Sequence, residues 1–266
     1  MKRYAVFVAR FALVPMISGT FSVSSGGRAS VIEWAHTVAG FALIYLIVFL
    51  VLRSIVQRQG RCLAISALSL ALMEAIPGMP RLHAAISPVL FATLFLLSVT
   101  LDKTPARPRQ KSARIWFLPG LVLTAIYFGV GYRHQSSSVV AHIGVAMLAA
   151  GIVLGFCMFI NEKHPADSPL RGIASLTMAA VLFQVTAGIT ALVIRMLDMN
   201  GGLALALART AHITGAGPLL AVTTLLALRY REIGVDRRSS AEHGFSAASS
   251  ISCPPPQPHP SQPPSP

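Results

Sequence analysis

The sequence predicts an all-α integral membrane protein of eight transmembrane helices, arranged as two pseudo-repeated four-helix bundles. Three observations lead to this prediction. The chain has a mean hydropathy of +0.65 and 12% charged residues, about half the charged fraction of an ordinary soluble domain. Apolar runs of about 20 residues, each long enough to cross a bilayer, recur along its length. Four histidines stand near the start of every second run.

The first apolar run extends from Tyr4 to Val23 and contains Arg10. Its length and its internal charge favour a retained helix over a cleaved signal peptide. The later runs are separated by short connections, except at 102–114. In chain order, the expected helices are 4–23, 31–52, 62–79, 82–101, 115–132, 138–160, 171–195 and 207–229.

These runs divide the chain into four parts. We expect an N-terminal four-helix half at 1–101, a basic cytoplasmic loop at 102–114 and a C-terminal four-helix half at 115–230. The remainder, 231–266, is rich in Ser and Pro. Such a composition does not form a packed core, so we expect a disordered cytoplasmic tail there.

The basic residues predict the orientation in the membrane. Counted from the expected helix ends, sixteen of the 22 Lys and Arg residues lie on one side, five on the other, and Arg10 within the first helix. Cytoplasmic loops carry such an excess, so we expect a multi-pass protein of the inner (plasma) membrane with both termini in the cytoplasm. The net charge of +13 is dispersed over these loops. The expected partner is therefore the lipid bilayer and no nucleic acid.

The candidate functional residues are His36, His83, His142 and His212, near the starts of the second, fourth, sixth and eighth expected helices. Even-numbered helices cross the membrane in the same direction, so the four imidazoles are expected at a similar depth near the outer face. Two neutral imidazoles that face each other across a bundle can supply both axial ligands of a heme iron. Four of them predict two heme sites. The alternative is four interfacial histidines that bind backbone groups or water.

The sequence around these histidines repeats weakly. The stretch 35–40 resembles 141–146, and Pro88 and Pro218 follow His83 and His212 at similar distances. We therefore expect two copies of one four-helix unit and two similar sites. Repeated halves also occur in transporters, which is a further reading of the same pattern.

Glu33 stands three residues before His36, and residues at this spacing share a helix face. Val139 occupies the equivalent place before His142, so an acid is expected at the first site only. The alternative is a carboxylate that the dipole favours at a helix N-terminus. Glu74 and Gln184 also lie in apolar runs, and we expect them to pack within the bundle.

Taken together, these features resemble the heme A synthase family. The resemblance rests on eight helices, on histidines at the outer ends of the even-numbered helices, and on two stretches. These are Glu33-Trp34-Ala35-His36 and Phe183-Gln184-Val185-Thr186-Ala187-Gly188, the second being similar to a Gln–x–x–x–Gly pattern of the family. It covers about residues 1–230.

The resemblance implies an oxidoreductase that oxidises a methyl group of heme O to give heme A for cytochrome oxidase. It implies a heme b cofactor held by His142 and His212. The substrate heme would lie between His36 and His83, with Glu33 essential to the reaction. The partners it implies are a heme O synthase, an electron donor and a second copy of the chain.

The sequence departs from the family in two places. Thr37 follows the first histidine where the family has Arg, and the loop after the first helix lacks the cysteine pair of many members. Two other functions therefore stay open: a diheme b-type electron carrier of the membrane, and a non-catalytic heme-binding assembly factor. Glu33 favours the enzyme, because a simple carrier needs no acid at one site only.

Overall fold

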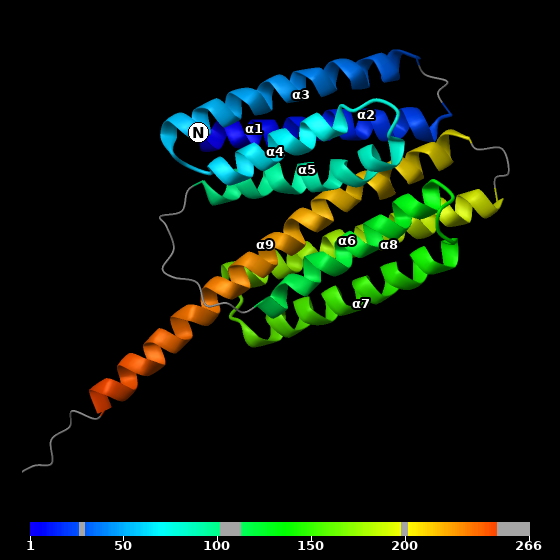
Figure 1. The fold of residues 1–266 in the computed structure, drawn as a ribbon. Helices are drawn as coiled ribbons and strands as arrows, with labels where there is room; N and C mark the ends of the chain where they lie inside the picture. Colours follow the sequence, from blue (N-terminus) through cyan, green and yellow to red (C-terminus); the bar gives the residue numbers. More distant parts are fainter. Residues whose placement is uncertain (27–29, 102–112, 198–201, 249–266) are drawn as a thin grey trace, which may run out of the picture.

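The computed structural model describes residues 1–26, 30–101, 113–197 and 202–248, and these residues form helices and turns without a β-strand (Figure 1). The helices of the first half are α1 (Lys2–Phe11), α2 (Leu13–Ser24), α3 (Ser30–Gln57), α4 (Arg61–Glu74) and α5 (Pro80–Thr100). Those of the second half are the 3-10 turn η1 (Ala113–Trp116) and the helices α6 (Phe117–Arg133), α7 (Val139–Lys163), α8 (Pro169–Leu197) and α9 (Leu203–Ala248).

Six segments of the described chain are long and apolar enough to cross a membrane, α1 and α2 counting as one segment. They are Lys2–Ser24, Val31–Gln57, Pro80–Thr100, Val139–Lys163, Pro169–Leu197 and Leu203–Glu232. Large apolar side chains are exposed along them, as on Phe41, Tyr45 and Leu182. Such a surface is stable against lipid and not against water. The chain therefore has the build of an all-α, multi-pass membrane protein.

The two remaining expected helices are shorter. Helix α6 has 17 residues and α4 has 14, so α4 rises only about 21 Å, less than the roughly 30 Å of a hydrocarbon core. The sequence predicted a helix to position 79, but α4 ends at Glu74. Pro77 disfavours a helical conformation in the residue before it, and Gly78 has a φ of +79°, which favours glycine.

Other helix ends also follow from the sequence. The first expected helix divides at Ala12, because Pro15 has no N–H to donate to the Phe11 carbonyl. Helix α9 continues to Ala248, beyond position 231 where we expected the tail to begin. The stretch 231–248 contains no proline to stop it. Residues 249–266, where proline is dense, lie outside the described residues.

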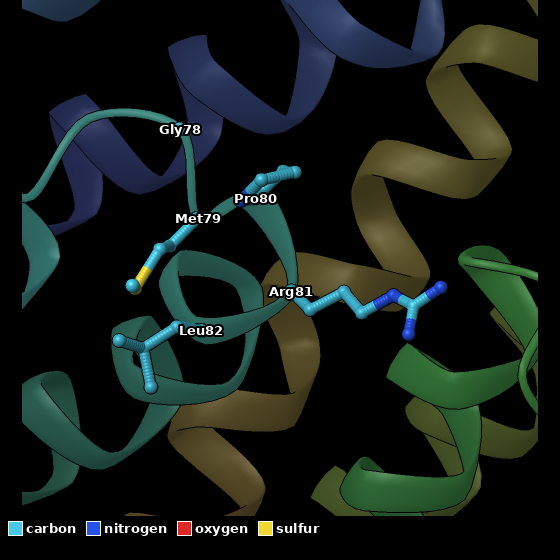
Figure 2. Close-up of a pocket in the computed structure, with 5 residues that line it drawn as sticks. All are labelled: Gly78, Met79, Pro80, Arg81 and Leu82. Atoms are coloured by element: carbon cyan, nitrogen blue, oxygen red, sulfur yellow. The ribbon is translucent and has the colours of Figure 1, made fainter.

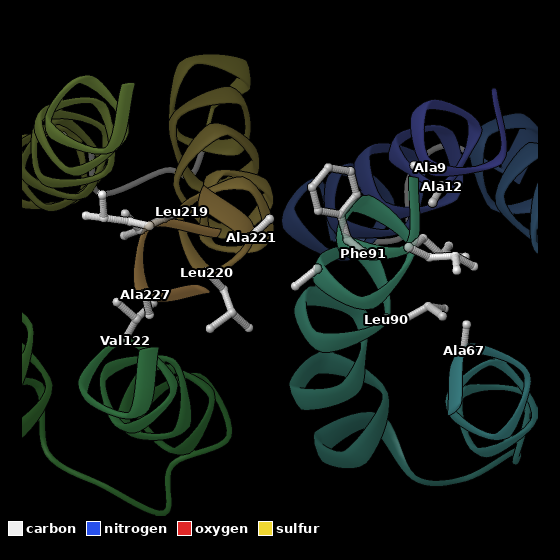
Figure 3. Close-up of a cluster of buried hydrophobic side chains, with 14 of the residues drawn as sticks. Ala9, Ala12, Ala67, Leu90, Phe91, Val122, Leu219, Leu220, Ala221 and Ala227 are labelled. Atoms are coloured by element: carbon white, nitrogen blue, oxygen red, sulfur yellow. The ribbon is translucent and has the colours of Figure 1, made fainter. Parts of the chain in front are cut away.

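The two halves share one hydrophobic core. Helix α9 packs against α8 and α6 of its own half and against α5 and α2 of the other. One cluster of buried apolar side chains runs from Val8 in α1 to Leu226 in α9, and Figure 3 shows Leu220 of α9 and Phe91 of α5 within it. Phe91 lies against Gly217 of α9. This seam fixes α5 and α9, which carry His83 and His212, relative to each other.

Candidate functional site

The four histidines lie in two facing pairs. His36 of α3 and His83 of α5 have ring centroids 5.7 Å apart, with the ring planes at 85°. His142 of α7 and His212 of α9 have centroids 6.2 Å apart, with the planes at 69°. Each pair joins the two histidines of one half of the chain. These are the pairs that the family resemblance implied.

Three of the imidazoles are oriented by a backbone carbonyl of the preceding helix. Nδ1 of His36 lies 2.8 Å from the Pro15 oxygen of α2. Nδ1 of His83 lies 3.1 Å from the carbonyl oxygen of Glu74 in α4, and Nδ1 of His212 lies 3.0 Å from that of Gln184 in α8. Because a carbonyl only accepts, Nδ1 carries the proton and donates it. Nε2 therefore keeps a free lone pair, as histidines that ligate metals do.

His142 differs from the other three in one bond. Its Nδ1 is buried and has no hydrogen-bond partner among the described residues. The carbonyl of Ala125, in the preceding helix α6, is the group that faces it, but outside hydrogen-bonding geometry. A buried, unpaired ring nitrogen is costly. A small rotation of the ring toward Ala125 would complete the arrangement seen at the other histidines.

Glycines make room for three of the rings. A Cβ atom on Gly19, Gly129 or Gly188 would lie 2.5, 2.9 or 2.9 Å from Cε1 of the histidine packed against it. Each glycine follows, by four positions, the residue whose carbonyl faces that ring. Residues four apart lie one above the other on a helix face. A histidine ring that reaches the carbonyl of one residue therefore packs over the residue four positions later, which is the glycine. Gly78 likewise follows Glu74, the last residue of α4, by four positions.

Gln184 binds His212 twice. Its carbonyl accepts from Nδ1 of the ring, and its side-chain Nε2 donates to the His212 carbonyl at 2.7 Å. Sequence reasoning had given Gln184 a packing role. Its glutamine-to-glycine spacing has a direct physical meaning in the structure, because Gln184 holds the ring and Gly188 admits it.

A cavity of about 590 Å³ lies in the second half and is lined by both His142 and His212. Its volume falls in the usual range of about 300–1,000 Å³ for cofactor sites. Helices α6 to α9 supply most of the wall, through apolar side chains such as Val122, Ala146 and Leu219. An apolar chamber with two imidazoles in it suits a flat, apolar ligand that contains a metal.

The fit to heme can be tested on the ring spacing. An ion midway between two imidazoles holds the ring centroids about 6 Å apart, because each metal–nitrogen bond is about 2 Å and each nitrogen lies about 1 Å from its ring centre. The 6.2 Å between His142 and His212 agrees with this value. Within the described residues, no group of three or more His, Cys, Asp or Glu could hold a bare metal ion. Two imidazoles alone suit an iron whose other ligands come from a porphyrin.

The first pair has a carboxylate beside it that sequence reasoning undervalued. The Glu74 side chain is 17% exposed, and its Oε1 lies 3.8 Å from Nε2 of His83. The Ser87 hydroxyl of α5 donates to the same carboxylate oxygen. The signal was present in the sequence, since ionisable groups within apolar runs are usually functional.

Glu33 lies elsewhere. It is exposed on α3, and its carboxylate has no hydrogen bond or ion pair with the described residues. Its backbone carbonyl accepts a hydrogen bond from the Thr37 hydroxyl at 3.0 Å. The structure therefore places Glu74, rather than Glu33, against the histidine pair of the first half. The catalytic role of Glu33 stays a prediction.

A second hollow, of about 380 Å³, lies at the turn before His83 and is lined by 78–82. Figure 2 shows the Arg81 side chain pointing away from Met79 and Leu82, toward the second half. There its Nη2 donates to the His134 carbonyl at 3.0 Å. This hydrogen bond ties the start of α5 to the end of α6.

No protein-family model and no curated protein matches this chain.

Proposed function

We propose that this chain is a membrane heme protein with the activity of a heme A synthase. In this proposal the second half holds heme b, and the first half oxidises a methyl group of heme O to give heme A for cytochrome oxidase. The observation that carries the proposal is the pair of facing imidazoles in each half, at 5.7 and 6.2 Å. The Nδ1–carbonyl bonds that leave Nε2 free support it.

The proposal includes eight membrane helices in two pseudo-repeated four-helix bundles, with α4 and α6 as the short members. The recurrence of one local arrangement favours the repeat. The same three elements recur in each half. They are a helix carbonyl, a glycine four residues later and a histidine of the next helix that packs against both. The Lys and Arg bias favours both termini on the cytoplasmic side of the inner membrane.

In the second half, His142 and His212 would hold the heme b iron. When bound, this group supplies one-electron redox chemistry. The protein residues have two tasks there. Gln184 and Gly188 orient the His212 ring, and the apolar wall of the cavity excludes water from the porphyrin faces.

In the first half, His36 and His83 would hold heme O as substrate. One dioxygen molecule is enough for the conversion: one oxygen atom stays on the methyl carbon as a formyl group, and the other leaves as water with two of the three hydrogens. Charge develops at the porphyrin edge during such an oxidation, and a fixed carboxylate stabilises it. Glu33 is the predicted carboxylate, and the position of Glu74 makes it a second candidate.

A diheme electron carrier is the competing proposal. The exposure of Glu33 favours this carrier, because an exposed carboxylate that contacts neither histidine of the first pair has no evident catalytic task. A carrier needs both imidazole pairs but no substrate. A heme-binding assembly factor would likewise bind heme without changing it.

Heme extraction separates these functions. The full chain is expressed with a heme O synthase in a host that makes no heme A, and the membrane hemes are extracted and separated by chromatography. We expect heme A with the wild-type chain and none with His36→Ala or His83→Ala. Heme O and heme b without heme A in the wild-type extract would favour the carrier or the assembly factor.

A further inference from the structure

Three arginines gather around the second-half cavity. Arg133 ends α6, Arg195 lies near the end of α8 and Arg209 lies near the start of α9, and all three line the cavity with His142 and His212. The Lys and Arg count places all of them on the outer side. Within the described ranges none of the three forms an ion pair with an acidic side chain. Asp198 lies outside those ranges, and one carboxylate balances only one of three charges.

Two of these charges, on Arg133 and Arg209, lie close enough to repel each other. The same positive field reaches the neighbouring loop, where burial lowers the pKa of His134 and the charges of Arg133 and Arg81 lower it further. Like charges around an apolar cavity are costly without a counter-ion. The arrangement is therefore complete only with an anionic group among the three guanidinium groups.

The arginines are linked to the histidine pair through one aromatic ring. The Arg195 guanidinium donates a hydrogen bond to the Tyr132 hydroxyl and lies 5.7 Å from the centre of its ring. The Tyr132 ring in turn stacks on His142, with centroids 6.4 Å apart and planes at 7°. A ligand that reaches His142 therefore extends along Tyr132 toward Arg195.

We propose that Arg133, Arg195 and Arg209, the arginine cluster, bind carboxylates on one edge of the molecule that fills this cavity. The inference rests on the proposed function: the molecule is an iron porphyrin and the carboxylates are its propionates. The apolar wall of the cavity would take its apolar face, and His142 and His212 would hold its iron. Arginine pairs with carboxylates through two parallel hydrogen bonds, so the cluster would orient the bound molecule as well as bind it.

In the first half, the arginine that precedes the α5 histidine points in a different direction. Arg81 precedes His83 much as Arg209 precedes His212, but its guanidinium turns to the His134 carbonyl of the second half. Arg81 therefore neither faces the first pair nor lines the second-half cavity. The cluster therefore marks the second half as the site that retains its porphyrin.

The test uses the full chain in nanodiscs of zwitterionic phosphatidylcholine, so that no anionic headgroup occupies the cluster. Binding of free-acid heme and of heme dimethyl ester, which lacks both carboxylates, is followed by the visible absorption of the His142–His212 site. A charged hydrogen bond contributes enough for about a tenfold effect or more. We expect the wild-type chain to bind the dimethyl ester at least tenfold more weakly.

Variants assign this preference to the cluster. Arg195→Gln and Arg209→Gln should bind the free acid about tenfold more weakly and lose the preference over the ester, while Arg195→Lys keeps part of it. Arg81→Gln, a charge lost from the same face but not from the cavity wall, is the matched control and should keep the full preference.

The outcomes are distinct. Equal binding of acid and ester by the wild-type chain overturns the arginine proposal and leaves the heme site standing. A preference that survives in both glutamine variants also overturns it. A wild-type chain that binds neither porphyrin overturns the proposed function and this inference together. The comparison of acid and ester needs no variant, so a poorly folded variant does not remove the test.

Discussion

Gln184 and His212 exchange two hydrogen bonds across the contact between α8 and α9. The His212 ring donates to the Gln184 carbonyl, and the Gln184 side chain donates at 2.7 Å to the His212 carbonyl. The two bonds fix the position of the α9 backbone and the orientation of the ring at once. An axial ligand held in this way loses little entropy on binding a metal, because its rotamer and tautomer are already set.

The close contact between Gly188 and the His212 ring gives the first prediction. In Gly188→Ala the new Cβ would lie 2.9 Å from Cε1 of His212, so the ring must move off its carbonyl. We expect at least a tenfold fall in heme bound per protein at the second site, measured by pyridine hemochrome assay. Gly172→Ala, on the same helix with open space around it, is the control and should bind heme normally. Equal heme content in the two variants would contradict the role of Gly188.

Glu33 gives the second prediction. Glu33→Gln removes the carboxylate that the family resemblance assigns to the reaction and should keep the heme b of the second half. If Glu33 acts on the substrate, heme A in membrane extracts falls by about a hundredfold, the usual effect of losing one electrostatic group. If it is only a charge at a helix end, worth about 0.3–1 kcal/mol of stability, heme A stays near the wild-type level. That second result would remove Glu33 from the active site.

Glu74 gives the third prediction, with the same assay. Glu74→Gln keeps an acceptor for the Ser87 hydroxyl and keeps the backbone carbonyl that His83 binds, so His83 stays in place. Only the charge beside Nε2 is lost. We expect heme A formation to fall at least tenfold while the spectrum of the second site is unchanged. Normal heme A from Glu74→Gln, with a defect in Glu33→Gln, would return the role of the acid to Glu33.

Orientation in the membrane gives the fourth prediction. Reporter fusions in the turn at Gln59 and at the C-terminus should both report the cytoplasm, because the excess of basic residues lies on that side. A fusion at Gln135, between α6 and α7, should report the opposite side. A cytoplasmic reporter at Gln59 together with a C-terminal reporter outside the cytoplasm would contradict an even number of membrane crossings.

The sequence was sufficient for the helical class and for an expected common depth of the four histidines, whereas their pairing was implied only by the family resemblance. Apolar runs of membrane length leave little choice of structure, and histidines at one end of alternate helices gather at one depth. A common depth does not by itself select partners, and the approach of His36 to His83 depends on how α3 and α5 pack. The spacing of Gln184 and Gly188 was visible as a motif, but its meaning depended on the ring that packs there.

The surroundings of the first pair could not be read from the sequence. Glu74 reaches His83 because α4 stops early and the turn at Gly78 brings Ser87 of α5 beside it. The direction of the Arg81 side chain likewise depends on how closely the two halves pack. Both relationships come from turn geometry and tertiary contacts, which a hydropathy pattern does not predict.

Absorption spectroscopy of the purified protein tests the central claim most directly. A chain that holds heme b between His142 and His212 should show a low-spin b-type spectrum in the oxidised and reduced states. His142→Ala and His212→Ala should each lose that spectrum while their amounts in the membrane stay at the wild-type level. His134→Ala, a histidine outside the pairs, should keep it. Unchanged heme content and spectrum in both His142→Ala and His212→Ala would contradict the account.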